Sequence, residues 1–236
     1  MKGFGNKSYS KKTTDQFNNK NSSKQKILNQ ANAFALQGNV SEAAKCYKLF
    51  FQKGFSDARV SMKLAHILFK EGKLNEAKQY LQKAIEIKPD FAEAHYNLGI
   101  ILKDLDKLKE AELSYRKAIK IKPDFAGAYY NLGIILRDLD KLEEAESLFR
   151  EAIKIKADYA QAYYNLGIIL KDLDKLKEAE LSYRKAIEIK PDYSEAYYSL
   201  GNILRNLGKS IESNECYQRS LDLKPWQINI AWRINN

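Results

Sequence analysis

Apolar and polar positions along this chain repeat with a period of 34 residues. The clearest mark is a segment centred on Gly99, Gly133, Gly167 and Gly201, which reads YNLGIIL three times and then YSLGNIL. With Ala92 as position 1, the glycine stands at position 8, and an alanine at position 20 recurs in most units. A period of this length is typical of a stacked-repeat solenoid, in which each unit packs only against its neighbours. We expect six units: 24–57, 58–91, 92–125, 126–159, 160–193 and 194–227.

Each unit is predicted to hold two amphipathic helices, here named helix A and helix B, with a tight turn between them. In the third unit the apolar positions follow helical spacing in two series, separated by Asp106 and Lys107. Position 15 is always glycine or aspartate, two residue types that accept a left-handed turn conformation. Proline follows helix B in most units. Three pairs resemble capping boxes for the next helix A, namely Asp90 with Glu93, Asp158 with Gln161 and Asp192 with Glu195.

The repeated positions resemble those of the tetratricopeptide repeat (TPR) family. The family pattern has large residues at positions 4, 7, 11 and 24, small residues at 8, 20 and 27, and proline at 32. In position order, the third unit carries His95, Leu98, Gly99, Leu102, Ala111, Tyr115, Ala118 and Pro123. The units are similar to those of bacterial TPR proteins and of O-linked N-acetylglucosamine transferases. This resemblance implies an all-α fold, a right-handed superhelical α-solenoid of six stacked helix-turn-helix TPR units.

The outer units depart from the family pattern. Gln30 and Ala31 stand at the leucine and glycine positions of the first unit, and Ser213 and Ser220 replace the two packing alanines of the last. Terminal repeats commonly vary in this way because one of their faces meets solvent instead of a neighbour.

The resemblance also implies a candidate binding site, the concave groove lined by helix A. Its rows at positions 5, 6, 9 and 12 are tyrosine, asparagine, isoleucine and a cation, except that Ser199 replaces the last asparagine and Asn202 the last isoleucine. The predicted groove residues are Tyr96, Asn97, Ile100, Lys103, Tyr130, Asn131, Ile134, Arg137, Tyr164, Asn165, Ile168, Lys171, Tyr198, Asn202 and Arg205.

The chemistry of these rows suits an extended peptide or a partner protein. Tyrosine offers rigid contact area, an asparagine amide both donates to and accepts from a peptide unit, and the cations favour acidic segments. The asparagines resemble the ladder that holds substrate backbone in the O-linked N-acetylglucosamine transferases. A second interpretation stays open, in which tyrosine and asparagine are scaffold residues typical of the family.

Charge is concentrated at the amino end of the chain. Residues 1–23 hold five lysines and one aspartate without apolar periodicity, which predicts a disordered basic tail. This tail carries +4 of the net charge of +10 and leaves +6 for the remaining 213 residues. Nucleic-acid binding through the tail is therefore the least favoured of the functions considered.

No catalytic, metal or cofactor site is expected. His66 and His95 are the only histidines, and neither has ligands or catalytic partners at helical spacing; His95 takes a position that is tyrosine in later units. Cys46 and Cys216 share position 23 of the first and last units and are expected to be free thiols.

Neither an apolar run long enough to span a membrane nor a signal peptide is present, which favours a cytoplasmic location. After Pro225 the chain reads WQINIAWRINN, and residues 228–236 are expected to form a short tail or partial cap. The first choice of function is a non-catalytic interaction scaffold. The alternative is a substrate-recruiting TPR region of a glycosyltransferase-type or other TPR-fused transferase, or a paralogue derived from one. Near-identical units would also permit self-association.

Overall fold

The structure, a computed structural model, describes residues 6–224, with side chains from residue 21 onward. Regular structure in this range is entirely α-helical, as the sequence predicts, and is divided into two units that meet between Leu105 and Asp106. Both tryptophans, Pro225 and the predicted tail or cap at 228–236 lie outside the described residues.

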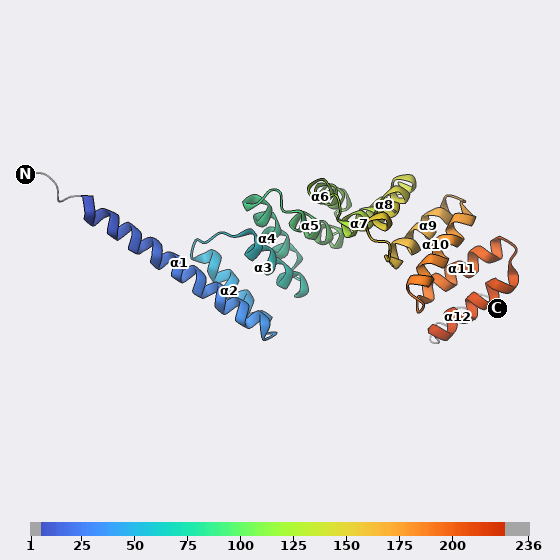
Figure 1. The fold of residues 1–236 in the computed structure, drawn as a ribbon, viewed down its shortest axis with the longest axis horizontal. Helices are drawn as coiled ribbons and strands as arrows, with labels where there is room; N and C mark the ends of the chain where they lie inside the picture. Colours follow the sequence, from blue (N-terminus) through green and yellow to red (C-terminus); the bar gives the residue numbers. More distant parts are fainter. Residues whose placement is uncertain (1–5, 225–236) are drawn as a thin grey trace, which may run out of the picture. The chain divides into compact units, whose positions relative to one another are not determined.

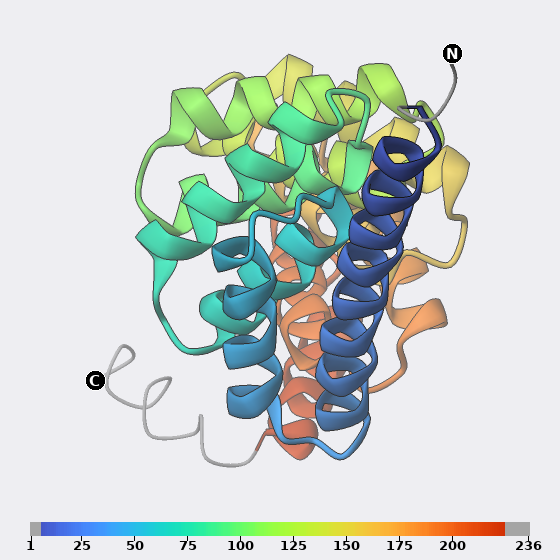
Figure 2. The ribbon, with the colours of Figure 1, turned by 90° about the vertical axis from the view of Figure 1, so that its left-hand side faces the viewer.

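The first unit consists of antiparallel helix pairs (Figure 1). Helix α1 packs along α2, α3 along α4, and α4 also contacts α5. Figure 2 shows α1 and α2 standing side by side. The largest fully buried side chains here include Tyr47, Phe50, Leu64, Leu68 and Leu81. The helices are α1 (Asn6–Leu36), α2 (Val40–Gln52), α3 (Ala58–Lys70), α4 (Leu74–Ile87) and α5 (Ala92–Asp104).

Helix α1 differs from the sequence-based expectation of a disordered tail over residues 1–23. It begins at Asn6 and runs for 31 residues, whereas its partner α2 has 13. Ile27 and Ala31 of α1 are buried against the first hairpin. Once packing has fixed that part of the helix, each added residue gains a backbone hydrogen bond without a new nucleation step, so apolar periodicity is not required for the extension.

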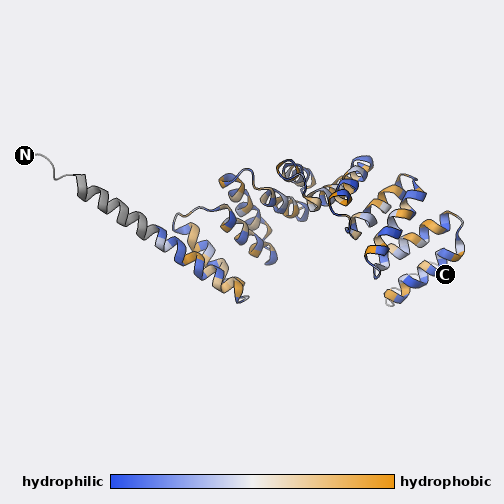
Figure 3. Cartoon of the chain, viewed as in Figure 1, coloured by the Kyte–Doolittle hydropathy of each residue, from blue (hydrophilic) through white to orange (hydrophobic). Residues whose placement is uncertain are grey.

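The second unit repeats the same pairing. Helix α6 packs on α7, and three hairpins follow, α7/α8, α9/α10 and α11/α12. Hydrophobic and hydrophilic residues alternate along each of these helices (Figure 3). The helices are α6 (Leu108–Ile121), α7 (Ala126–Asp138), α8 (Leu142–Ile155), α9 (Ala160–Asp172), α10 (Leu176–Ile189), α11 (Ser194–Asn206) and α12 (Ser210–Leu223).

The turn between helix A and helix B is the one that the sequence predicts. Asp106, Asp140 and Asp174 have φ values of 57°, 59° and 59°. Gly38, Gly72 and Gly208 occupy the same position of other 34-residue repeats, with φ near 75°. Position 15 must therefore accept the left-handed region, which glycine does freely and aspartate does at low cost.

The predicted capping boxes are wrong. Helices α5, α9 and α11 have Phe91, Tyr159 and Tyr193 at the N-cap, and no side chain caps them. The carbonyl of the aromatic residue accepts from the backbone three residues later, as from Ala162 N–H to Tyr159 at 2.9 Å. An aromatic side chain is needed for packing at this position, and it cannot cap the helix. Backbone carbonyls of the turn therefore accept from N–H groups at the start of the helix.

The position 8 glycines mark where helix A crosses helix B. A Cβ atom on Gly167 would lie 2.6 Å from Cε1 of Tyr183, and one on Gly133 would lie 2.9 Å from the same atom of Phe149. Both rings stand at position 24 and are fully buried. Glycine is thus required by the close approach of the ring, as the repeat pattern predicts.

A ladder of ion pairs joins the helices B of the second unit. Glu146 on α8 binds Arg150 on its own helix at 2.8 Å and Lys175, which precedes α10, at 2.8 Å. Arg150 in turn binds Glu178 of α10 at 2.6 Å, and Glu180 with Arg184 repeats the arrangement. Burial acts to raise the pKa of Glu146, but hydrogen bonds from Lys175 and Arg150 outweigh it and hold that pKa below its usual value.

Candidate interaction surface

The tyrosines at position 5 lie in aromatic clusters. The Tyr130 ring on α7 is 5.9 Å from that of Phe149 and 4.9 Å from that of Tyr159, measured between centroids. Tyr164 on α9 repeats this geometry, with Tyr183 at 5.8 Å and Tyr193 at 5.0 Å. A lysine three residues earlier lies over the Tyr159 and Tyr193 rings. The rings of Tyr130 and Tyr164 are therefore each held between two others, and both are half-buried.

Asn165, at position 6 of α9, connects two repeats. Its Nδ2 donates to the Tyr130 hydroxyl at 3.2 Å and to the Gln161 carbonyl at 2.9 Å, and its Oδ1 accepts from Nη1 of Arg137 at 2.9 Å. The side chain is 7% exposed. Both amide protons are used within the scaffold, so only one lone pair of Oδ1 is left for a ligand. At this residue the geometry agrees with the scaffold interpretation of the asparagine row.

Positions 9 and 12 contribute apolar and charged groups to the same surface. Ile134 on α7 and Ile168 on α9 are both partly exposed. Arg137 binds Asp138 at 3.0 Å and Lys171 binds Asp172 at 3.1 Å, so two cations of the predicted row lie beside carboxylates. On α11 the cation at this position, Arg205, is exposed, and Asn206 follows it in place of an aspartate. The aspartate at position 13 is the sequence signal for this pairing.

The remaining predicted residues fall into two groups. Tyr96, Asn97, Ile100 and Lys103 lie on α5 in the first unit, and all four are partly buried. On α11 the tyrosine at position 5 is exposed, and Asn202 accepts a hydrogen bond from the Tyr217 hydroxyl at 2.9 Å. The structure brings together the predicted residues of α7 and α9 through the contacts described above.

The groups with potential chemistry lie on three different helices, His95 on α5, Cys46 on α2 and Cys216 on α12. His95 is partly buried, with its Nε2 3.0 Å from the carbonyl oxygen of Pro89. Cys46 and Cys216 are free, and burial raises the pKa of both thiols. Within residues 6–224 no three His, Cys, Asp or Glu side chains gather in a way that would hold a metal ion. Along the same stretch no helix is long and apolar enough to cross a membrane.

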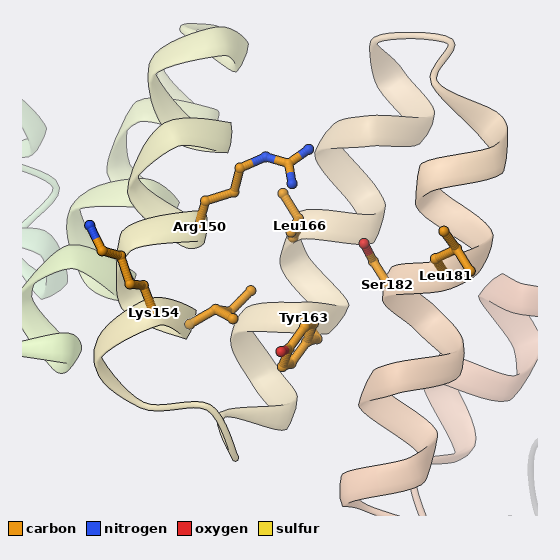
Figure 4. Close-up of a pocket in the computed structure, with 7 residues that line it drawn as sticks. Arg150, Lys154, Tyr163, Leu166, Leu181 and Ser182 are labelled. Atoms are coloured by element: carbon orange, nitrogen blue, oxygen red, sulfur yellow. The ribbon is translucent and has the colours of Figure 1, made fainter.

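A hollow of about 320 Å³ opens between helices B of the second unit (Figure 4). Its walls come from α8 and α10, and Tyr163 and Leu166 of α9 form its floor. At the repeat position where α8 carries Leu148, α10 carries the smaller Ser182, which leaves space. The Ser182 hydroxyl donates to the Glu178 carbonyl at 2.9 Å. Leu181 at the rim is 68% exposed. Sequence reasoning missed this hollow. Its signal was the reversed order of serine and leucine, which is Ser147-Leu148 in α8 and Leu181-Ser182 in α10.

Comparison with known proteins identifies the repeats. Four family models match, described as TPR repeat over residues 65–106 and as tetratricopeptide repeat over 92–125, 124–192 and 182–213. Together they run without a gap from residue 65 to residue 213, more than half of the chain. No curated protein matches the sequence.

Solved structures with the same fold are numerous. MamA is 25% identical with a TM-score of 0.66, over 70% of this chain and 97% of MamA. YrrB, titled a TPR protein with an unusual peptide-binding site, is 22% identical with a TM-score of 0.67, over 78% and 94%. PilF of Pseudomonas aeruginosa is 14% identical with a TM-score of 0.74, over 88% and 94%. With its matched repeats, its left-handed turns and its crossing glycines, the chain belongs to the tetratricopeptide repeat family.

Proposed function

We propose that this protein is a non-catalytic scaffold that binds an extended peptide, or an extended segment of a partner protein, along the helix A surface of α7 and α9. The observation that carries the proposal is the row of partly exposed side chains on these helices, held in place by contacts between repeats. Tyr130, Ile134, Tyr164 and Ile168 form its apolar part.

Rigidity favours binding on this surface. Each tyrosine is fixed by two neighbouring rings, and Tyr130 is also held by the hydrogen bond from Asn165. Side chains that are ordered before a ligand arrives lose less conformational entropy when it binds. An extended peptide can place alternate side chains against such rows while its other face stays in water.

The charge preference of the ligand is a separate prediction. The cations at position 12 were expected to favour acidic segments, but Asp138 and Asp172 bind Arg137 and Lys171. These carboxylates lower the positive potential that an acidic peptide would meet. The apolar contacts of position 9 are therefore proposed as the main source of affinity, with charge deciding the direction and register of the peptide.

The test begins with peptides selected from a random displayed library on the full chain, and then measures one labelled peptide by fluorescence anisotropy. Ile168→Lys is expected to weaken the Kd by about tenfold or more, equivalent to about 1.4 kcal/mol. The matched control is Leu181→Lys, which places the same charge on an exposed residue of helix B in the same repeat. Peptides that lose affinity through Leu181→Lys and ignore Ile168→Lys would assign binding to the helix B hollow and refute the proposal.

A further inference from the structure

The last hairpin exposes an aromatic pair that the earlier hairpins of the second unit cover. Tyr198, at position 5 of α11, is 54% exposed, whereas Tyr130 and Tyr164 are half-buried. Its neighbour Tyr217, at position 24 of α12, is also half-buried, whereas Tyr183 at the same position of α10 is 1% exposed. The two rings lie 5.6 Å apart. They form an apolar face on the end of the unit.

In the earlier hairpins a third ring covers this pair. It belongs to position 34, immediately before the next helix A, and lies 4.9 Å from Tyr130 and 5.0 Å from Tyr164. In the last repeat position 34 is Gln227, and a tryptophan, Trp226, stands one residue earlier. Lys224 corresponds to the lysines that lie over the third ring elsewhere, and here it binds Glu195 instead.

We propose that the C-terminal segment 225–236 docks on the end face formed by Tyr198 and Tyr217, with Trp226 in the place of the missing third ring. This inference does not depend on the proposed function. Trp226 follows Lys224, the last described residue, by two positions, which allows a reach of about 7 Å at the usual extension per residue. Lys224 binds Glu195, which lies one helical turn before Tyr198 on α11, so a reach of this length starts beside that part of the helix.

The composition of the segment suits an apolar face. It carries two tryptophans and three isoleucines with a single charged residue, Arg233, and Trp232 stands one repeat length after Tyr198. A segment tethered two residues from its site is present at a high effective concentration, whereas a second copy of the chain must associate from solution. The docked segment would withdraw Tyr198 from any ligand and leave α7 and α9 as the open part of the helix A surface.

Tryptophan fluorescence tests this directly, because both tryptophans of the chain lie in the segment. In the full chain with Trp232→Phe, Trp226 is the only tryptophan, and excitation at a wavelength that tyrosine does not absorb makes it the only residue whose emission is recorded. Its emission is expected to be blue-shifted from that of N-acetyltryptophanamide, and acrylamide is expected to quench it less. Adding Tyr198→Ala should shift the emission to the red and raise the quenching, whereas Tyr198→Phe, which keeps the ring, should preserve both values. The matched control is Tyr130→Ala on α7, which should change neither.

Three results would overturn the proposal. Emission and quenching of Trp226 equal to those of the free amide would show an undocked segment, whatever the variants do. Shielding that survives Tyr198→Ala, with helicity intact by circular dichroism, would place Trp226 elsewhere. Shielding that disappears on dilution of the parent protein would assign the face to a second copy of the chain.

Discussion

The hairpins α9/α10 and α11/α12 have the same backbone arrangement, but the hydrogen bonds of their buried polar side chains are made in different ways. In α9/α10 the groups at the repeat boundary are covered by neighbours, as Asn165 is by Arg137 and Tyr130. In α11/α12 the hairpin uses its own hydrogen bonds. Ser194 and Ser220 each donate to the carbonyl of the other, at 3.1 and 3.0 Å, and Ser213 donates to the Gly201 carbonyl at 2.8 Å.

The difference teaches that the last described repeat forms within itself the hydrogen bonds that the repeat before it forms with its neighbours. The alanines that interior repeats pack at positions 20 and 27 become serines whose hydroxyls all find buried partners. A hydroxyl that is buried with a partner contributes a little stability, while one without a partner is destabilising. The two serines that depart from the repeat pattern therefore fill the same buried positions as the alanines and form hydrogen bonds within their own hairpin.

The largest effect is expected from alanine at the crossing glycines. Gly167→Ala places a Cβ 2.6 Å from the Tyr183 ring, which is fully buried and has no room to move. We expect a loss of about 2 kcal/mol in the free energy of unfolding, within the range for overpacked cores. Gly201→Ala makes the same contact with Tyr217, whose half-buried ring can move at the cost of its hydrogen bond to Asn202. The better helix propensity of alanine offsets that cost, so little net change is expected.

Urea unfolding followed by circular dichroism compares the two variants. A large loss for Gly167→Ala with little change for Gly201→Ala would support the contrast between interior and terminal rings. Equal losses would show that Tyr217 is confined as tightly as Tyr183 and would remove that contrast.

Smaller effects on stability, opposite in sign to each other, are expected when two buried serines are replaced by alanine. Ser220→Ala removes the hydrogen bond to Ser194 and should lower stability by about 1 kcal/mol. Ser61, at position 4 of α3, is fully buried and its hydroxyl has no hydrogen-bond partner within the described residues. Ser61→Ala should therefore raise stability by up to about 1 kcal/mol. Thermal unfolding of both variants measures this, and a loss at Ser61 would mean that its hydroxyl has a partner in solution.

The smallest effect concerns pH and the ion-pair ladder. The pKa of Glu180 is below its usual value although burial acts to raise it, because Lys209 and Arg184 donate hydrogen bonds to it. A carboxyl with a lowered folded-state pKa contributes stability above its unfolded pKa, and this contribution is lost as pH falls through the folded value. We therefore expect Glu180→Gln to lower stability at neutral pH by a few tenths to about 1 kcal/mol, since the pairs are partly solvated.

The measurement is the melting temperature of parent and variant from pH 7 down to pH 3. The difference between them should shrink in acid, once the parent carboxyl is protonated. The control is Ser147→Ala on α8, an exposed residue without a titratable group, for which the difference between parent and variant should stay constant with pH. A difference that stays constant with pH would show that Glu180 acts by packing alone.

Local features were the most predictable from sequence. The left-handed turn at Asp140 and Asp174 follows from residue type at a fixed position, and the approach of Tyr183 to Gly167 follows from the repeat phase. The capping boxes failed because Tyr159 is held at the N-cap by its contact with Tyr130, a demand that overrides the local preference for a capping side chain. In the candidate site, the sequence predicts rows of side chains at fixed positions, but it does not predict which polar groups pair between repeats.

The sequence by itself determined the period, the paired helices, their turns and the small residues at their crossings, because each of these depends on neighbours within one unit. Only the tertiary structure decided which polar groups meet between repeats. Asn165 bonds to Arg137 and Tyr130 across 28 and 35 residues, and Arg150 bonds to Glu178 across 28. These contacts depend on how far one hairpin is rotated against the next, which the packing of many side chains sets together. Asn165 thereby became a link between repeats, and Tyr198 a surface without a cover among the described residues.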